Sequence, residues 1–145
     1  MGERAAAASR AAFQYFLPIQ SRWMDNDAYG HVNNVVYYSW FDTVVNEYLV
    51  RNDALDIQAG RVIGLVVETQ CSYFNELSFP ERIDAGLSVA RIGRSSVRYE
   101  IGLFGESAEK ASAQGHFVHV YVDRDTRRPV DLPPPLRQAL ERICR

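Results

Sequence analysis

The segment "RWMDNDAYGHVNN", which runs from position 22 to 34, concentrates residues whose types and spacing could do chemistry. Asp27 comes three residues before Gly30, and Asn33 and Asn34 stand where an apolar, helix-like stretch begins. The first turn of a helix has unpaired N–H groups and about half a positive charge, so it can stabilise an oxyanion. A carboxylate beside it could attack a polarised carbonyl or activate a water for that attack. An acid, a tight turn and a helix start in this order make Asp27 a candidate catalyst.

The same loop also has a purely structural interpretation. Asp25 and Asp27 can be turn and capping residues, which loops use freely. His31 could be a general base, but we favour a role in fixing the loop by hydrogen bonding. In either interpretation Asp25, Gly30, His31 and Asn33 support the turn. The residue types alone leave both interpretations of Asp27 open.

A second polar segment, "IGRSSVRYE", could hold a phosphate. Gly93 and the hydroxyls of Ser95 and Ser96 lie beside Arg94 and Arg98, and this combination suits an anion. A polar hairpin with charged flanks is the commoner structure for such a segment, so the pattern does not decide alone.

The elements that must position these residues follow from hydrophobic periodicity. Apolar residues recur at three- and four-residue spacing from about Asn34 to Val50, which predicts a helix that is mostly buried. Asp42 and Glu47 lie on its less apolar side, where we expect solvated carboxylates. A first strand is predicted over 13–24, with Pro18 marking it as irregular or at an edge. Four runs with period two are predicted over 62–74, 82–89, 97–103 and 117–122, and a short final helix over 136–144.

Five strands and one long apolar helix predict an α+β fold. The economical packing is an antiparallel sheet that curls around the long helix, with the short C-terminal helix outside. Residues 1–12 are expected to be a flexible tail, and 13–145 a single domain. One sheet with one helix leaves strand edges exposed, and pairing with a second copy would cover them. We therefore expect a homo-oligomer.

Composition excludes several classes of protein. The chain has 145 residues and a formal net charge of -2, which argues against nucleic-acid binding. It contains no apolar run long enough for a membrane span. Two distant cysteines, Cys71 and Cys144, favour a reduced cytoplasmic protein without disulfides. The histidines lack metal-site spacing, because His116 and His119 would point to opposite faces of a strand, so no metal is expected.

The stretch "RWMDNDAYGHVNNVVYYSWFDTVVNEYL" resembles the 4-hydroxybenzoyl-CoA thioesterase branch of the hot-dog-fold thioesterases, particularly its bacterial acyl-CoA thioesterases. Those proteins have a D-x-D-x-x-G-H-V-N-N block that leads into an aromatic-rich central helix. The segment "VYVDRDTRRPVDLP" is similar to the family's final strand and exit. The resemblance implies a hot-dog fold and the hydrolysis of a fatty or other acyl-CoA to the free acid and CoA. It implies no cofactor, since CoA is part of the substrate.

The resemblance also implies roles for individual residues. The second acid of the block is the catalytic carboxylate, which corresponds to Asp27 here. The thioester carbonyl lies against the amides of the helix start, near Asn34. The residues after the third strand bind CoA, which indicates Arg94 and Ser96, and with less weight Ser95.

In the family the active site lies between two subunits, so the resemblance implies a homodimer or a homotetramer. Asp27 would then face strand residues of a partner, and Glu68 and Gln70 are candidates from that strand. The acyl group would enter a tunnel beside the central helix, whose walls could include Tyr37, Tyr38 and Trp40.

Two other functions remain as alternatives. A hydratase or dehydratase on the same fold would use a Gly-His-Phe-Pro-type or Asn-Pro-x-x-His-type loop, and "GHVNN" lacks the proline of either. A non-catalytic acyl-CoA or acyl-carrier binding module is opposed by the presence of Asp27. The branch that acts on 4-hydroxybenzoyl-CoA itself does not carry the His-Val-Asn-Asn run, which favours other acyl groups.

Overall fold

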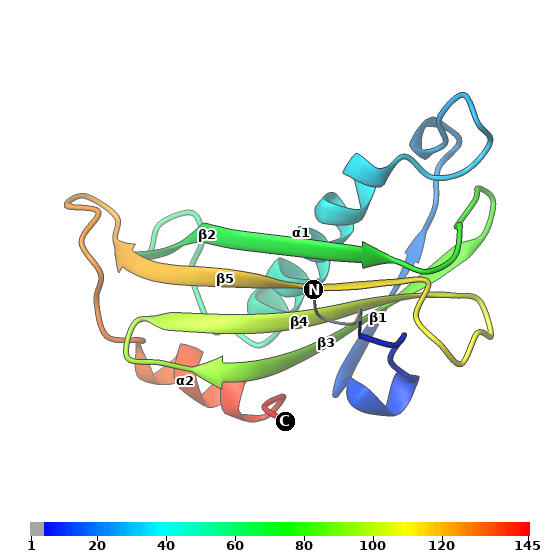
Figure 1. The fold of residues 1–145 in the computed structure, drawn as a ribbon. Helices are drawn as coiled ribbons and strands as arrows, with labels where there is room; N and C mark the ends of the chain where they lie inside the picture. The colour runs from blue at the N-terminus through cyan, green and yellow to red at the C-terminus, as the bar shows by residue number, and fades with distance from the viewer. Residues whose placement is uncertain (1–4) are drawn as a thin grey trace, which may run out of the picture.

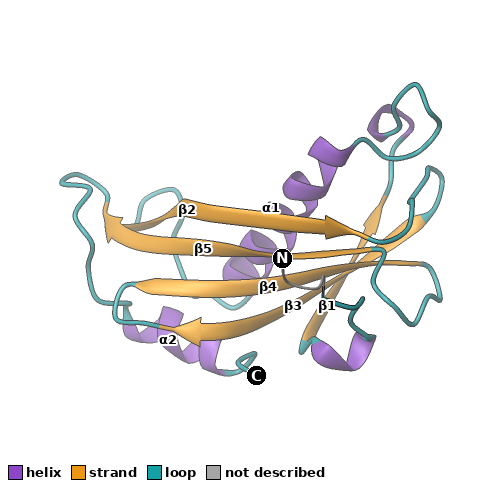
Figure 2. Ribbon diagram, viewed as in Figure 1, coloured by secondary structure: helices purple, strands orange, loops and turns teal. Residues whose placement is uncertain are grey.

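The computed structural model of the protein describes residues 5–145. In this part of the chain, one long helix and five strands make up most of the structure (Figure 2). The helices are α1 (Asn34–Arg51) and α2 (Pro134–Glu141), and the strands are β1 (Tyr15–Gln20), β2 (Val62–Tyr73), β3 (Arg82–Ile92), β4 (Ser96–Gly105) and β5 (Ala113–Asp123). Short 3-10 turns at Arg10–Ala12 and Trp23–Asp25 flank β1.

The strands form one antiparallel sheet in the order β1-β3-β4-β5-β2. The sheet curls around α1, which crosses its inner face diagonally, and α2 lies beside the end of β3 (Figure 1). The predicted α+β fold, a five-stranded antiparallel sheet wrapped around a long central helix with a short C-terminal helix, is confirmed. It is a hot-dog fold.

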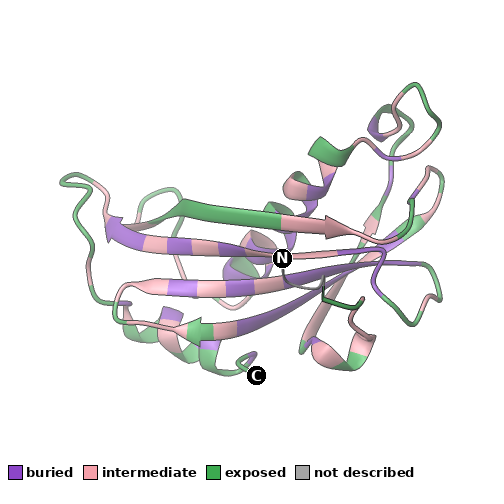
Figure 3. Ribbon diagram, viewed as in Figure 1, coloured by how far each residue is buried: buried purple, intermediate pink, exposed green. Residues whose placement is uncertain are grey.

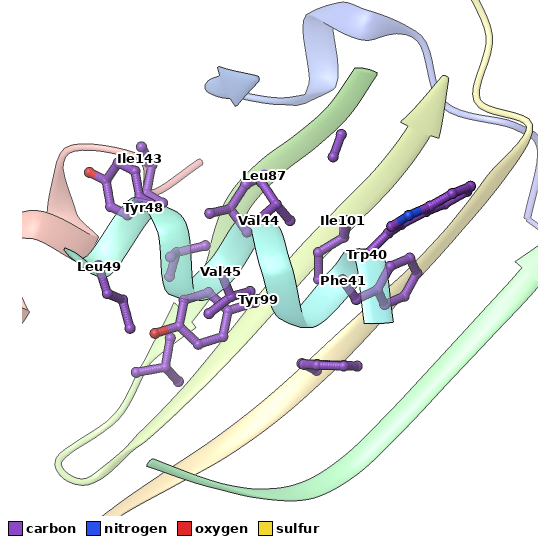
Figure 4. Packing of buried hydrophobic residues seen from close by; sticks show 14 of the residues in the cluster. Trp40, Phe41, Val44, Val45, Tyr48, Leu49, Leu87, Tyr99, Ile101 and Ile143 are labelled. Carbon is purple, nitrogen blue, oxygen red and sulfur yellow. The ribbon is translucent and has the colours of Figure 1, made fainter. Parts of the chain in front are cut away.

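The core lies between α1 and the inner face of the sheet (Figure 4). The wide apolar stripe predicted for α1 is buried at Tyr37, Trp40, Phe41, Val44, Val45, Tyr48 and Leu49. Inner-face residues of β3 and β4, among them Leu87, Tyr99 and Ile101, pack against this stripe. Burial of so many large side chains fixes the direction of α1 relative to the sheet, and hence the position of its first turn.

The two edges of the sheet differ. β1 is an edge strand, which agrees with the presence of Pro18. Past the end of β1, the C-terminal residues cover the edge of β3: the Val89 N–H donates to the Ile143 carbonyl, and the Val89 carbonyl accepts the Arg145 N–H. The other edge, β2, is exposed along most of its length (Figure 3). Val67 is 60% exposed and is the extra residue of a bulge between Val66 and Glu68. The predicted alternation along β2 therefore holds only after the bulge.

Some boundaries differ from the prediction for physical reasons. β1 ends at Gln20 because residues 23–25 form a 3-10 turn. α2 ends at Glu141 because residues 143–145 extend along β3. Residues 8–12, expected to belong to a flexible tail, are attached to the sheet. Ala8 donates its N–H to Gln114 (2.7 Å) and Arg10 forms an ion pair with Asp84 (3.0 Å). Residues 1–4 lie outside the described part of the chain.

Cys71 is half-buried, Cys144 is exposed, and both are unpaired. Within residues 5–145, no helix is long and apolar enough to cross a membrane.

Candidate active site

Asp25 anchors the loop that precedes α1. Its side chain is buried and accepts hydrogen bonds from the Arg22 N–H (2.7 Å) and from the Arg22 guanidinium (2.8 Å). Its carbonyl accepts the Asn33 N–H at 2.9 Å. These contacts tie both ends of the loop to Asp25.

Between these ends the chain makes a tight turn. The Asp27 N–H donates to the His31 carbonyl (2.9 Å), and the Gly30 N–H donates to the Asp27 carbonyl (3.2 Å). Gly30 has φ +88°, a conformation that other residues adopt only at a cost. Ser78 bonds the Gly30 carbonyl (3.0 Å), which ties the turn to the loop between β2 and β3.

The first turn of α1 leaves one amide available. Asn33 is the N-cap, and its side chain accepts the Val35 N–H at 3.0 Å while its carbonyl accepts the Val36 N–H at 2.9 Å. The Asn34 N–H has no hydrogen-bond partner among the described residues. It is an unpaired donor at the positive end of an eighteen-residue helix, which suits a carbonyl oxygen that gains negative charge.

The Asp27 carboxylate shares a cavity with this helix start. One oxygen, Oδ1, accepts the Tyr29 N–H at 2.8 Å, and Oδ2 accepts no hydrogen bond from residues 5–145. The cavity has a volume of about 330 Å³. It is lined by Asp27, His31, Val32, Asn34, Tyr37, Tyr73, Phe74, Asn75 and Glu76.

Neutral phenol groups form much of the cavity wall. Burial raises the pKa of Tyr37 to about 12, and burial also raises the pKa of Tyr73. The Tyr73 hydroxyl donates to the Asn34 carbonyl (3.3 Å), so the end of β2 is bonded to the start of α1. His31 stacks on Tyr29 and has its Nε2 3.6 Å from Glu76 on the open side.

Of the residues expected to form the acyl pocket, one lines this cavity and the others lie in the core or on the outer face of the sheet. Tyr37 lines the cavity, and Tyr38 is half-buried and stacks on Phe117, with 6.5 Å between ring centroids. Trp40 points into the core and is not among the cavity's lining residues (Figure 4). Glu68 and Gln70 lie on the outer face of the sheet, where Glu68 pairs with His116 (2.7 Å). Within one chain they are not part of the cavity.

The predicted CoA-binding residues lie elsewhere. Arg94 and Ser95 are in the turn between β3 and β4, and Ser96 begins β4, at the opposite end of the sheet from the Asp27 loop (Figure 1). The Arg94 side chain is exposed and pairs with Asp131, and the Ser95 carbonyl accepts the Tyr121 N–H. One chain alone does not bring this turn to Asp27.

Sequence reasoning missed the wall that the chain after β2 contributes. Phe74, Asn75 and Glu76 line the cavity because the Val32 N–H bonds the Leu77 carbonyl (2.7 Å), which draws the two loops together. The segment "NELSFPE", which supplies much of this wall, has the residue types of a turn. Its composition carries no signal of which other loop it would meet.

Comparisons with known proteins agree with this architecture. The structure of PA5185 from Pseudomonas aeruginosa PAO1 is similar to this one, with a TM-score of 0.94. The two chains are 53% identical in sequence, and the match covers 96% of this chain and 97% of PA5185. A DHNA-CoA thioesterase from Staphylococcus aureus is 21% identical over 88% of this chain and 89% of its own, with a TM-score of 0.79, and this shows a common fold. YsmA from Bacillus subtilis (strain 168) is 23% identical over 83% of this chain and 81% of its own length.

The family assignment comes from a direct match. The model of the Thioesterase-like superfamily matches residues 21–140, which include the Asp27 loop, α1 and all strands after it. This chain therefore belongs to the Thioesterase-like superfamily.

Proposed function

We propose that this protein hydrolyses acyl-CoA thioesters, with Asp27 as the catalytic carboxylate. One observation carries the proposal: Asp27 and Asn34, whose N–H has no partner among the described residues, line the same cavity of about 330 Å³. A thioester needs both groups, one to polarise its carbonyl and one to attack it or to activate water.

In this mechanism the Asn34 N–H donates to the thioester oxygen, and the positive end of α1 stabilises the charge that develops there. Asp27 then either attacks the carbonyl carbon to form a mixed anhydride, or takes a proton from a water that attacks. In the first route the C–S bond breaks as the anhydride forms, and a water molecule then hydrolyses the anhydride. In the second route the C–S bond breaks when the tetrahedral adduct of water collapses. In both, the leaving thiolate takes up a proton from water or from Asp27, and the acyl group ends as the free acid. The routes differ in whether the acyl group is ever bound to Asp27.

The family supports an acyl thioester as the substrate. The Staphylococcus aureus relative is a thioesterase for DHNA-CoA, so aryl groups belong in any substrate panel for this chain. The apolar and aromatic part of the wall, from Val32, Tyr37, Tyr73 and Phe74, suits fatty or other uncharged acyl groups, and the acids Asp27 and Glu76 disfavour an anionic one.

We also propose that the functional unit is a homodimer, or a tetramer of such dimers, formed through β2. This strand is an uncovered edge with exposed apolar side chains at Leu65, Val66 and Val67. An unpaired edge of this length invites pairing with a second copy. A two-fold axis perpendicular to the sheet pairs identical edges antiparallel.

This pairing supports the assignment of the CoA turn. The Asp27 cavity adjoins the end of β2 at Tyr73, whereas the turn with Arg94 lies at the end of the sheet where β2 starts. Antiparallel pairing sets the end of one β2 beside the start of the other. In such a dimer, Arg94 of the partner subunit would lie toward the Asp27 cavity. Within one chain, Arg94 and Asp27 are at opposite ends of the sheet.

The test is thiol release by the wild type and by Asp27→Asn over a panel of acyl- and aryl-CoA esters. We expect the substitution to lower kcat about 10²- to 10⁴-fold. It keeps the size of the side chain and an oxygen for the Tyr29 N–H, so the melting temperature should change little. Near wild-type hydrolysis by the variant would exclude Asp27 as the catalyst.

The same panel separates the alternatives. Hydration of crotonyl-CoA without thiol release would favour a hydratase. Tight binding of acyl-CoA without either reaction would favour a binding module.

A further inference from the structure

A second cavity lies between the middle of α1 and the strands β2 and β5, away from the Asp27 loop. Its volume is about 110 Å³, enough for a few heavy atoms. Its polar lining comes from Asp42 and Asn46 of α1 and from His119 of β5, and the remaining walls are apolar or aromatic. The Asn46 amide donates to the Asp42 carboxylate at 3.0 Å, so the carboxylate is held in place.

His119 is the unusual member of this lining. It is 5% exposed, and its Nε2 is buried without a hydrogen-bond partner in residues 5–145. Burial lowers the pKa of His119 to about 4, so the ring is neutral near pH 7. A neutral imidazole has one N–H donor and one acceptor nitrogen. A polar ring in such surroundings is expensive unless a partner bonds to it.

Gly64 keeps the space over this ring open. A Cβ at this position would lie 2.8 Å from Cε1 of Tyr121 and 3.4 Å from Nδ1 of His119. Nδ1 therefore faces Gly64, which itself lines the cavity. A glycine inside a strand often marks a site where a ligand approaches closely.

One row of α1 residues runs past both cavities. Asn34, Tyr38, Asp42 and Asn46 are four residues apart and so share one side of the helix. Asn34 lines the first cavity, while Asp42 and Asn46 line the second. Tyr38, between them, stacks on Phe117, the inner-face neighbour of His119 on β5. At 1.5 Å per residue, the row places the second cavity about 12–18 Å from the helix start.

The chemistry of the lining selects the group that would fit. A hydroxyl both donates and accepts, so it can pair with Nδ1 of His119 in either tautomer. It can also donate to the Asp42 carboxylate. A carboxylate on the ligand would be repelled by Asp42, and a methyl group could bond neither to Nδ1 nor to the Asp42 carboxylate.

We propose that the cavity around His119 binds a hydroxyl group at the far end of the acyl chain, so that hydroxyacyl thioesters are the preferred substrates. The inference rests on the proposed thioesterase function, because the carbonyl must lie at Asn34 for the chain end to arrive here. An extended alkyl chain advances about 1.3 Å per carbon, so the span corresponds to ~10 to 14 carbons.

The kinetic test compares ω-hydroxyacyl-CoA esters of ~10 to 14 carbons with isosteres that carry a methyl in place of the hydroxyl. The wild type should prefer the hydroxylated ester in kcat/KM by about tenfold at the best length, the value of one net hydrogen bond. His119→Phe should abolish this preference. His119→Asn should retain part of it, because its amide lies where Nδ1 was.

Two further variants keep this test interpretable. His116→Phe is the matched control, since it removes a histidine from the outer face of the same strand, and it should keep the preference. If His119→Phe fails to fold, Asp42→Ala on the exposed side of α1 should still lower the preference. An equal kcat/KM for both esters at every length in the wild type would overturn the proposal.

A binding measurement separates this proposal from the proposed function. The ring nitrogens of His119 are observed by NMR while the free ω-hydroxy acid, or its methyl isostere, is added. A shift of the His119 signals with the hydroxy acid alone supports the cavity assignment, even if no acyl-CoA is hydrolysed. Thiol release with no His119 shift and no hydroxyl preference would leave the thioesterase function intact and refute the subsite.

Discussion

The most informative perturbation of the candidate site is Asn34→Pro, because it removes the backbone N–H to which the mechanism assigns a role. Asn34 is the first residue of α1, a position where proline is favoured. Its N–H has no partner in the described chain, so no hydrogen bond within the protein is lost. The preceding Asn33 has φ -63° and ψ 136°, an extended conformation compatible with a following proline.

The expected effect follows from the role assigned to that N–H. Removal of one oxyanion donor typically lowers kcat by about 10²- to 10³-fold, or roughly 2.7–4 kcal/mol of transition-state stabilisation. Stability should change by no more than about 0.5 kcal/mol, since the helix start tolerates proline. Asn34→Ala is the matched variant: it also deletes the side chain but keeps the N–H. The ratio of kcat between the two variants therefore isolates the backbone donor.

The assay is thiol release at saturating acyl-CoA, with melting temperatures for both variants. We expect equal melting temperatures and a kcat ratio of at least about 10². If Asn34→Pro hydrolyses within about threefold of Asn34→Ala, the N–H does not stabilise the transition state. A lower melting temperature for the proline variant alone would refute the helix-start geometry.

Three other predictions concern the turn, the buried histidine and the exposed edge. Gly30→Ala should lower the free energy of unfolding by about 1–2 kcal/mol in urea titrations, since a Cβ there meets no atom within 4 Å and only φ +88° opposes it. Burial lowers the pKa of His119 from 6.5 to about 4. Between these two pH values the unfolded chain therefore binds more protons than the folded chain, and the free energy of unfolding falls as the pH drops from 6.5 to about 4. The His119→Phe protein should lack this loss, which amounts to about 2–3 kcal/mol between about pH 7 and 4.5, and an equal loss in both proteins would contradict the prediction. Val67→Lys should convert the proposed oligomer to a monomer in light scattering and abolish thiol release. Val50→Lys, the same change at an exposed valine of α1, should do neither.

The helix and the loop before it were the most predictable parts of the molecule. Seven apolar positions at helical spacing can be buried in one way, against a sheet, and all seven are buried. The cap at Asn33 and the turn at Gly30 also follow from local chemistry, because each depends on residues within four positions along the chain. Such local interactions can be inferred from residue order.

What depended on distant parts of the chain was less accessible. The wide stripe of α1 did not indicate which aromatic side chains would turn toward the cavity, and Trp40 packs into the core whereas Tyr38 lies toward β5. The bulge at Val67 has no marker residue, so the alternation along β2 was interpreted as unbroken. Likewise, burial of His119 depends on the pairing of β5 with two neighbours, and a period-two run does not say which of its faces points inward.

The first turn of α1 must both be capped and, in the proposed mechanism, donate an N–H to the substrate. Different residues meet these two requirements. Asn33 satisfies the amides of Val35 and Val36, which stabilises α1, and this leaves the Asn34 N–H unpaired. A buried N–H without a partner would cost about 1–3 kcal/mol, but here the donor belongs to a residue that lines a cavity, where water can bond to it. In the proposed mechanism a substrate carbonyl replaces that water and accepts the same N–H. If Asn33 were replaced by alanine, water would have to serve the Val35 amide as well, and the helix start would fray. We therefore expect Asn33→Ala to lower the free energy of unfolding by about 1 kcal/mol and also to lower kcat. If the variant loses stability but keeps the kcat of the wild type, the cap does not position the groups that act on the substrate.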